Sequence, residues 1–357
     1  MAQPRSEPLY GALRLVAPGT PLREGIDRIL QAKMGALIVV GDEPAVLNIC
    51  SGGFLLDAEF TPQRLSELAK MDGAIILASD GTRVARANVH LVPDPSIPTH
   101  EAGMRHRTAE RVARQTSATV LAISEKMHTV SIYIGEDHFT LESIPLVLAK
   151  ADQALQTLSR YRTRLDKEFA HLNQLEVENM VTLMDVTKVM ERSEMVMRMA
   201  DEVRFQVSEL GKDGRLLSLQ LGEVMAGIPR QRMMLIQDYV VSREGRSPDD
   251  VIADLEALTA DELMDDSTVT KTLGYSRTPE LANKVVRPRG YRILSMLPRL
   301  PMPVIENIIS RFENLKNILR AGPALLNEVE GVGERRAVAI KEGLDRIAES
   351  IIMESFI

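Results

Sequence analysis

Tryptophan is absent from this 357-residue sequence, and aromatic residues make up only 4% of it. Base recognition by stacked aromatic side chains is therefore poorly supported, and the cores must be filled by aliphatic residues and methionine. The single cysteine, Cys50, excludes an intramolecular disulfide and a zinc site built from cysteine pairs. No G-x-x-x-x-G-K-[S/T] stretch is present, which argues against a P-loop ATPase or kinase.

Long apolar runs are also missing. None approaches the roughly 18 residues of a membrane span, and the first residues lack the apolar core of a signal peptide. We therefore expect a cytoplasmic protein with no membrane contact and a reduced Cys50. The net charge of -7 argues against an indiscriminate basic coat for nucleic acid, although a local patch can still bind phosphates.

The length predicts two or three domains. Residues 1–147 alternate short apolar runs with short helical patterns, which predicts a mixed α/β domain with a helix-flanked sheet. The expected strands are 36–40, 74–78, 84–92, 119–123 and a hairpin of 129–134 with 138–141.

Residues 148–288 are predicted to form a long helical middle domain, since neither glycine nor proline occurs from Leu146 to Leu210. The helical pattern loses its phase at 176–179, where we expect a helix to break. One apolar seam resembles a short coiled coil and is the place where we expect a protomer contact. Its residues are Leu155, Leu158, Leu165, Phe169 and Leu172.

Asp72 and Gly73 lie between a predicted helix and the apolar run that begins at Ala74. The helix signal is Thr61 as N-cap followed by Pro62. A glycine in such a turn lets the backbone approach a ligand, and the neighbouring carboxylate can hold a divalent metal or accept a proton from a hydroxyl. The alternative is an ordinary Asp-Gly turn without a function.

Arg105, His106 and Arg107 follow a loop rich in proline and glycine and precede a predicted helix. Thr108 is a possible N-cap for this helix. Two guanidiniums and an imidazole at a helix N-terminus are typical of an anion site, with phosphate as the natural guest. A solvated basic turn is the alternative.

Gly331-Val332-Gly333 lies between two helical patterns in the last segment, 289–357. This pattern predicts a helix-hairpin-helix whose backbone amides bind DNA phosphates without reading bases. A weaker counterpart is Leu297 to Pro303, where prolines replace the glycines and leave a phosphate role in doubt. The alternative is a purely structural helical hairpin.

These signatures resemble those of the DNA-integrity scanning proteins, a family of bacterial diadenylate cyclases. The resemblance implies an N-terminal nucleotide-binding cyclase domain, a helical linker and a C-terminal tandem helix-hairpin-helix domain. It implies that two ATP are condensed into cyclic di-AMP and two pyrophosphates with Mg²⁺ or Mn²⁺ as cofactor. It also implies that the homo-oligomer is an octamer. Branched DNA is expected to bind and regulate the enzyme, which links the protein to DNA damage and repair. A two-fold symmetric product favours two facing half-sites.

The resemblance assigns the site residues. Asp72, Arg105, His106 and Arg107 are expected to be catalytic, with Asp72 as the metal ligand. The residues expected around ATP are Gly73, Ala74, Leu91, Met104, Arg105, His106, Arg107, Thr108 and Ser124. Gly331, Val332 and Gly333 are expected to bind DNA. The competing hypothesis is a non-catalytic DNA-binding scaffold that only senses a nucleotide.

Overall fold

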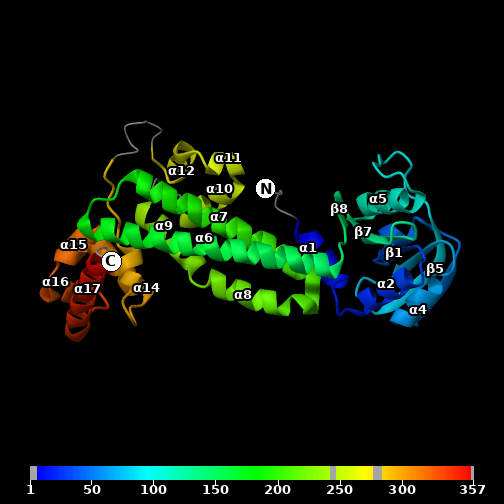
Figure 1. Ribbon diagram of the computed structural model, residues 1–357, viewed down its shortest axis with the longest axis horizontal. Coiled ribbons are helices and arrows are strands. Elements are labelled where there is room, and N and C mark those ends of the chain that lie inside the picture. Colours follow the sequence, from blue (N-terminus) through cyan, green and yellow to red (C-terminus); the bar gives the residue numbers. More distant parts are fainter. Residues whose placement is uncertain (1–5, 242–246, 276–283, 355–357) are drawn as a thin grey trace. The chain divides into compact units, whose positions relative to one another are not determined.

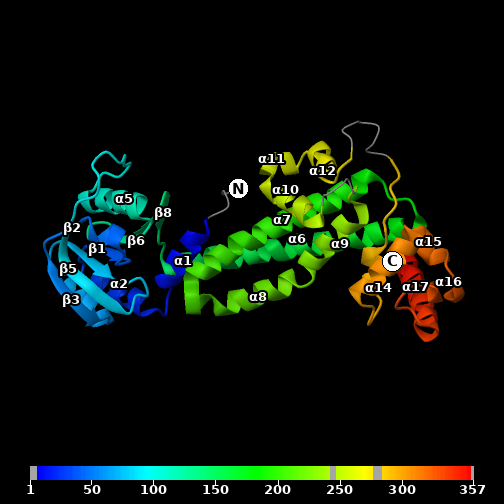
Figure 2. The same cartoon turned by 180° about the vertical axis from the view of Figure 1, so that it is seen from behind.

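The computed structural model describes residues 6–241, 247–275 and 284–354. The chain forms two compact units. One comprises Met1–Ala154 and Glu202–Gln220, and the other comprises Leu155–Asp201 and Leu221–Ile357. The two longest helices, α6 (Ile144–Glu178) and α7 (Leu183–Leu210), each contribute to both units (Figures 1 and 2).

The first unit contains a mixed sheet with the order β2-β5-β4-β1-β6-β7-β8, in which β3 also pairs with β5. Only β1 and β4 run parallel, and the other pairs are antiparallel. The predicted mixed α/β domain is confirmed, but β2 and β3 were not predicted. The strands are β1 (Ala36–Val40), β2 (Cys50–Ser51), β3 (Phe54–Glu59), β4 (Ala74–Leu77), β5 (Arg83–Leu91), β6 (Thr119–Ser124), β7 (Thr129–Ile134) and β8 (Asp137–Thr140).

Helices cover both faces of this sheet (Figure 1). Because successive strand residues point to opposite faces, Ile38 packs toward α2 and α4 while Val39 packs toward α5. The resulting cores are mainly aliphatic, as the composition predicted, and each contains one buried aromatic residue, Phe205 in the first and Tyr133 in the second. The helices of this unit, apart from its shares of α6 to α8, are α1 (Glu7–Leu15), α2 (Pro21–Gln31), α3 (Pro44–Leu47), α4 (Pro62–Leu68) and α5 (Met104–Thr116).

Two predicted helix starts have different outcomes. Thr61 caps α4, with its side chain accepting from the Arg64 amide, as expected. The prediction that Thr108 caps the next helix is wrong, because α5 begins at Met104 after Gly103 and Thr108 lies inside it. The inward face of α5 packs on the sheet. A hydrogen bond from the Arg107 amide to the Gly103 carbonyl adds one more turn at the start of the helix. The three basic residues therefore form the first turn of α5.

The second unit is helical in its described residues. α6 ends at Glu178 and Asn179 adopts a φ of 57°, which confirms the predicted break. The seam from Leu155 to Leu172 is buried within the chain itself, so its predicted role as a protomer contact is wrong. The further helices are α8 (Arg215–Met225), α9 (Ile228–Tyr239), α10 (Pro248–Ala257), α11 (Ala260–Leu263) and α12 (Asp266–Thr272); a 3-10 turn, Gly211–Gly214, precedes α8.

The C-terminal helices share one aliphatic core. They are tied to α9 through Asp238, whose carboxylate accepts the amides of Gly290, Tyr291 and Arg292. Across the described ranges, no helix is both long and apolar enough to cross a membrane. The C-terminal helices are α13 (Tyr291–Ser295), α14 (Met302–Phe312), α15 (Leu315–Arg320), α16 (Pro323–Asn327) and α17 (Glu334–Glu354).

Candidate active site

The sheet register brings three separate turns to one edge. Leu37 of β1 pairs with Ala74 of β4, so residues two positions earlier, Gly35 and Asp72, lie at the same edge. Ile123 of β6 pairs with Ala36, which places Ser124 beside Gly35. Neighbouring strands are about 4.8 Å apart, so these positions are close in space although they are distant in the sequence.

Gly73 and Asn88 fix the turn that carries Asp72. Gly73 has a φ of 91°, and a Cβ there would lie 2.9 Å from the backbone carbon of Asn88. Asn88 has a left-handed backbone, and its Nδ2 donates to the Asp72 carbonyl at 2.9 Å. Among the described residues the Asp72 carboxylate has no partner, and the residue is exposed. The carboxylate is thus held at the sheet edge and remains available to a ligand.

Arg105 reaches the same edge by lying on Gly35. A Cβ on Gly35 would be 2.2 Å from Nη1 of Arg105 and 3.1 Å from the Ile123 carbonyl. Any side chain at Gly35 would therefore displace the guanidinium. The structure brings Arg105 to the strand end next to Asp72, across the β1–β4 pair.

His106 points toward Tyr133 of β7, with 2.9 Å between Nδ1 and the phenol oxygen. The Tyr133 hydroxyl donates its one proton to Glu101 at 2.9 Å. Burial and this carboxylate raise the pKa of Tyr133 well above its usual range, so the phenol stays protonated. Nδ1 of His106 must then be the donor to the phenol, which leaves Nε2 as the atom that can meet a ligand.

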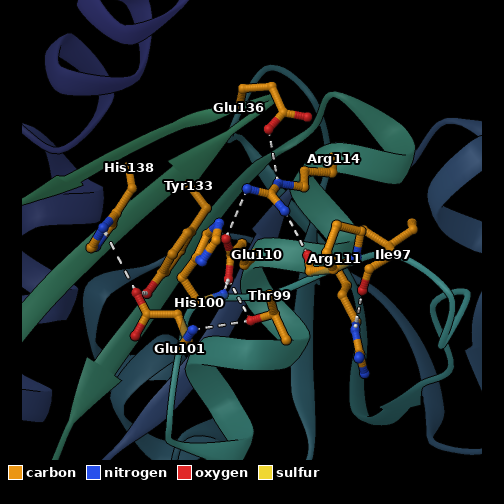
Figure 3. A network of polar contacts seen from close by, with 11 residues as sticks. Ile97, Thr99, His100, Glu101, Glu110, Arg111, Arg114, Tyr133, Glu136 and His138 are labelled. Carbon is orange, nitrogen blue, oxygen red and sulfur yellow. Dashed lines mark hydrogen bonds and ion pairs between the residues drawn. The ribbon is translucent and has the colours of Figure 1, made fainter.

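Further contacts hold Tyr133 and Glu101 in place, as Figure 3 shows. The His138 ring stacks on Tyr133 with centroids 4.6 Å apart, and its Nδ1 lies 3.7 Å from Glu101. Glu110 of α5 accepts from the Thr99 hydroxyl and from the His100 amide at 3.1 Å. The loop before α5 is therefore fastened to the helix that it precedes.

The pKa of Glu110 shows that its contacts favour the ionised carboxylate. Burial alone raises the pKa, but the hydrogen bonds from Thr99 and the His100 amide and the charge of Arg114, 3.0 Å away, lower it below the usual value. Glu110 is therefore a structural carboxylate that stays ionised. It anchors the loop that carries Glu101.

The other predicted site residues differ in exposure. The side chains of Ala74 and Leu91 are buried in the core, so only their backbones can meet a nucleotide. Met104 is 84% exposed, Arg107 is exposed and Thr108 is partly exposed. The Ser124 hydroxyl accepts from the Met127 amide at 3.2 Å, which closes its own turn.

Several residues of this site were not predicted. No local motif singles out Gly35, Asn88, Glu101, Tyr133 or His138, because each matters through a partner that only the fold supplies. In the described parts of the chain, no three His, Cys, Asp or Glu side chains are grouped to hold a metal. A lone carboxylate such as that of Asp72 would suit Mg²⁺ or Mn²⁺ only where substrate phosphates and water complete the coordination.

A second candidate site is the turn before α17. Gly331 has a φ of 82°, and Arg336 donates to its carbonyl. Val332 is buried in the C-terminal core and its amide donates to the Val329 carbonyl at 3.0 Å, so both its side chain and its amide hold the turn. Gly333 has open space where a Cβ would be.

Comparison with known families identifies the class of the first domain. A family model described as "DisA bacterial checkpoint controller nucleotide-binding" matches residues 23–138. A second model, "DisA bacterial checkpoint controller linker region", matches residues 141–282. The sheet domain is therefore a nucleotide-binding domain of this class, followed by its helical linker.

Full-length relatives give the particular family. A "DNA integrity scanning protein DisA" from Acidothermus cellulolyticus is 49% identical over 98% of this chain and 96% of its own. The proteins of the same name from Parafrankia sp. and Carboxydothermus hydrogenoformans are 47% and 46% identical, over 100% and 97% of this chain and 100% and 98% of their own. The chain belongs to the DNA integrity scanning protein DisA family.

Proposed function

We propose that this protein is a diadenylate cyclase, which condenses two ATP into cyclic di-AMP and two pyrophosphates. The observation that carries the proposal is the convergence of Asp72 and Arg105 at adjacent strand ends of a nucleotide-binding domain. An unpaired carboxylate beside a phosphate-binding cation is what attack by a hydroxyl on a phosphate requires.

In each of the two steps, the 3′-hydroxyl oxygen of one ATP bonds to the α-phosphorus of the other. The bond from that phosphorus to the pyrophosphate breaks, and the hydroxyl loses its proton. Arg105 and Arg107 hold the phosphates, and Asp72 orients the hydroxyl and accepts its proton. His106 adds a phosphate contact through Nε2, for which the ring must be doubly protonated because Tyr133 already engages Nδ1.

Mg²⁺ or Mn²⁺ is the proposed cofactor, with Asp72 as its protein ligand. When bound, the ion would neutralise phosphate charge and polarise the reacting oxygen. Gly73 allows the turn to lie close to the nucleotide, since the residue has no Cβ. Ala74 and Leu91 would contribute backbone atoms, and Ser124 a hydroxyl.

A homo-oligomer follows from the symmetry of the product. Two identical half-sites that face each other, each with one ATP, form an isologous interface. Phe54 and Leu55 of β3 are 58% and 76% exposed, and such apolar surface is typical of contact between proteins. Residues near them are better candidates for a protomer contact than the buried seam of α6. Octamer assembly is proposed from the family resemblance.

The C-terminal segment is proposed to be a tandem helix-hairpin-helix domain that binds branched DNA without reading its sequence. Gly331 and Gly333 support the proposal, because a left-handed glycine and an unobstructed Cβ position let backbone amides approach a phosphate. The length of α17, 21 residues, fits the second helix of such a motif.

The test is incubation of the purified full-length protein with ATP and Mg²⁺ or Mn²⁺, followed by mass analysis of the products. Cyclic di-AMP and pyrophosphate should form in a ratio of one dinucleotide to two pyrophosphates. The matched control is Asp72→Asn, which should still bind ATP but lose more than about a hundredfold in turnover. If ATP binds without any product, the nucleotide-sensing scaffold is the better description.

A further inference from the structure

The first C-terminal turn, 297–301, follows the same backbone path as the second, 329–333. Leu297 and Val329 are both buried, and each amide donates to the carbonyl three residues earlier, at 3.1 and 3.2 Å. The third position of each turn is left-handed, with a φ of 60° at Arg299 and 82° at Gly331. Each turn leads directly into a helix, α14 or α17. The two turns are therefore structural repeats.

Their chemistry differs, because the first turn and the start of its helix have fewer backbone amides that can donate to a ligand. Prolines occupy positions 298, 301 and 303, and proline has no amide hydrogen. Arginine occupies the left-handed position, a conformation that costs free energy for any residue with a Cβ. Strain of this kind is retained mainly where a side chain has a function.

Arg299 lines a cavity of about 430 Å³ together with Arg230 of α9. Both arginines are exposed, and neither forms a hydrogen bond or an ion pair with another described residue. The other lining residues are uncharged and include no carboxylate; they are Ser295, Met296, Leu297, Pro298, Leu300 and Pro301. The cavity thus presents two free guanidiniums from separate segments of the chain and no opposing charge.

We infer that this cavity binds a phosphodiester group of a nucleic-acid backbone through Arg230 and Arg299. The inference rests on the proposed DNA binding and extends it to a residue outside the predicted hairpin domain. The second turn, 329–333, lies next to α14, the helix that follows the first turn. A Cβ on Gly331 would be 3.2 Å from Val304, and Asn307 donates to the Glu330 carbonyl at 3.0 Å.

This proximity gives the two turns a shared ligand. Val304 and Asn307 belong to the first turns of α14, which starts where the first hairpin ends. One turn would hold a phosphate by guanidiniums and the other by amides, so that one strand can engage both. Two weak contacts on one ligand raise affinity by effective concentration.

The test compares DNA affinity and its salt dependence for the full-length protein and two variants. Arg299→Gly puts glycine at a left-handed position, so its melting temperature should be unchanged or higher while DNA affinity falls about three- to tenfold. Arg230→Gln should give a similar loss. Each variant should lower the slope of log affinity against log salt by about one.

Arg320→Gln is the matched control, because Arg320 is an exposed arginine at the end of α15, in the same C-terminal segment, and does not line the cavity. Unchanged DNA affinity and slope in both cavity variants would overturn the inference, and so would an equal loss in the control. If the wild-type protein binds no DNA, the proposed DNA function fails as well. If inorganic phosphate abolishes the difference between wild type and Arg299→Gly at millimolar concentration, the cavity binds free phosphate rather than a backbone.

Discussion

Replacing Glu176 by glutamine should make the helical unit more stable at neutral and alkaline pH. Glu176 lies in the last turn of α6 and its side chain is fully buried. Its Oε1 accepts from Arg292 and from the Tyr239 hydroxyl, both at 2.7 Å, while Oε2 has no hydrogen-bond partner. A buried carboxylate oxygen without a donor is costly when it is ionised.

Burial raises the pKa of Glu176 from its usual 4.5 to about 7, although Arg292 opposes this rise. Asp238, also buried, adds to it, and burial raises the pKa of Asp238 too. The folded state therefore binds the Glu176 proton more tightly than the unfolded state. The resulting stability is fully present below about pH 4.5 and is lost as the pH rises through 7, a total of roughly 3 kcal/mol.

Hydrogen exchange read by mass spectrometry on peptides of α6 and α13 measures the local free energy of opening. From about pH 5 to about pH 8, wild type should lose roughly 3 kcal/mol relative to Glu176→Gln. Glu178→Gln, an exposed neighbour on the same helix, should follow wild type. The reasoning is refuted if Glu176→Gln is less stable by the same amount at every pH, since the ionised pair with Arg292 would then be stabilising overall.

Three further predictions concern the nucleotide site. Arg105→Ala and Arg107→Ala should each weaken ATP binding, measured by calorimetry, roughly tenfold or more, because each removes a charge-assisted phosphate contact. Unchanged affinity in both variants would exclude these two phosphate contacts. Tyr133→Phe should keep the melting temperature within a few degrees but lower kcat about tenfold with a smaller change in KM, because Nδ1–H of His106 loses the hydroxyl that accepts its hydrogen bond. An unaltered kcat would make the phenol purely structural. Gly73→Ala should lower the stability of the first unit by about 1–3 kcal/mol in urea titrations and reduce cyclase turnover, since the Cβ strikes Asn88; full activity would show that the Asp72 turn tolerates displacement.

The C-terminal hairpins are best tested by point variants in the full chain. The sequence places a boundary near Arg289, but Arg292 just beyond it is paired with Glu176, and Asp238 holds the amides of residues 290–292. Cutting the chain there would remove the charged partner of Glu176 and the three amides that donate to the buried Asp238 carboxylate. Arg299→Gly avoids this difficulty.

Local signals in the sequence determined much of the fold. The Thr61 cap and the long run free of glycine and proline depend on neighbours along the chain, and so do the six expected strand segments, all of which agree with the observed strands to within one residue at each end. β3 was not predicted because it lies at the edge of the sheet with nearly all of its residues exposed. A strand of this kind lacks the alternation of buried apolar and exposed polar residues by which a strand is recognised in a sequence. The Asp72-Gly73 turn was likewise readable from its dipeptide alone.

Only the tertiary structure decided which side chains meet. Arg105 lies on Gly35, His106 on Tyr133, and Glu176 on Arg292, across 116 residues of sequence. Such pairs have no signature in a single sequence, because they depend on strand register and helix packing rather than on spacing. The start of α5 was misplaced for the same reason: Thr108 has the chemistry of a cap, but packing against the sheet and the first hydrogen bond to Gly103 carried the helix one turn past it.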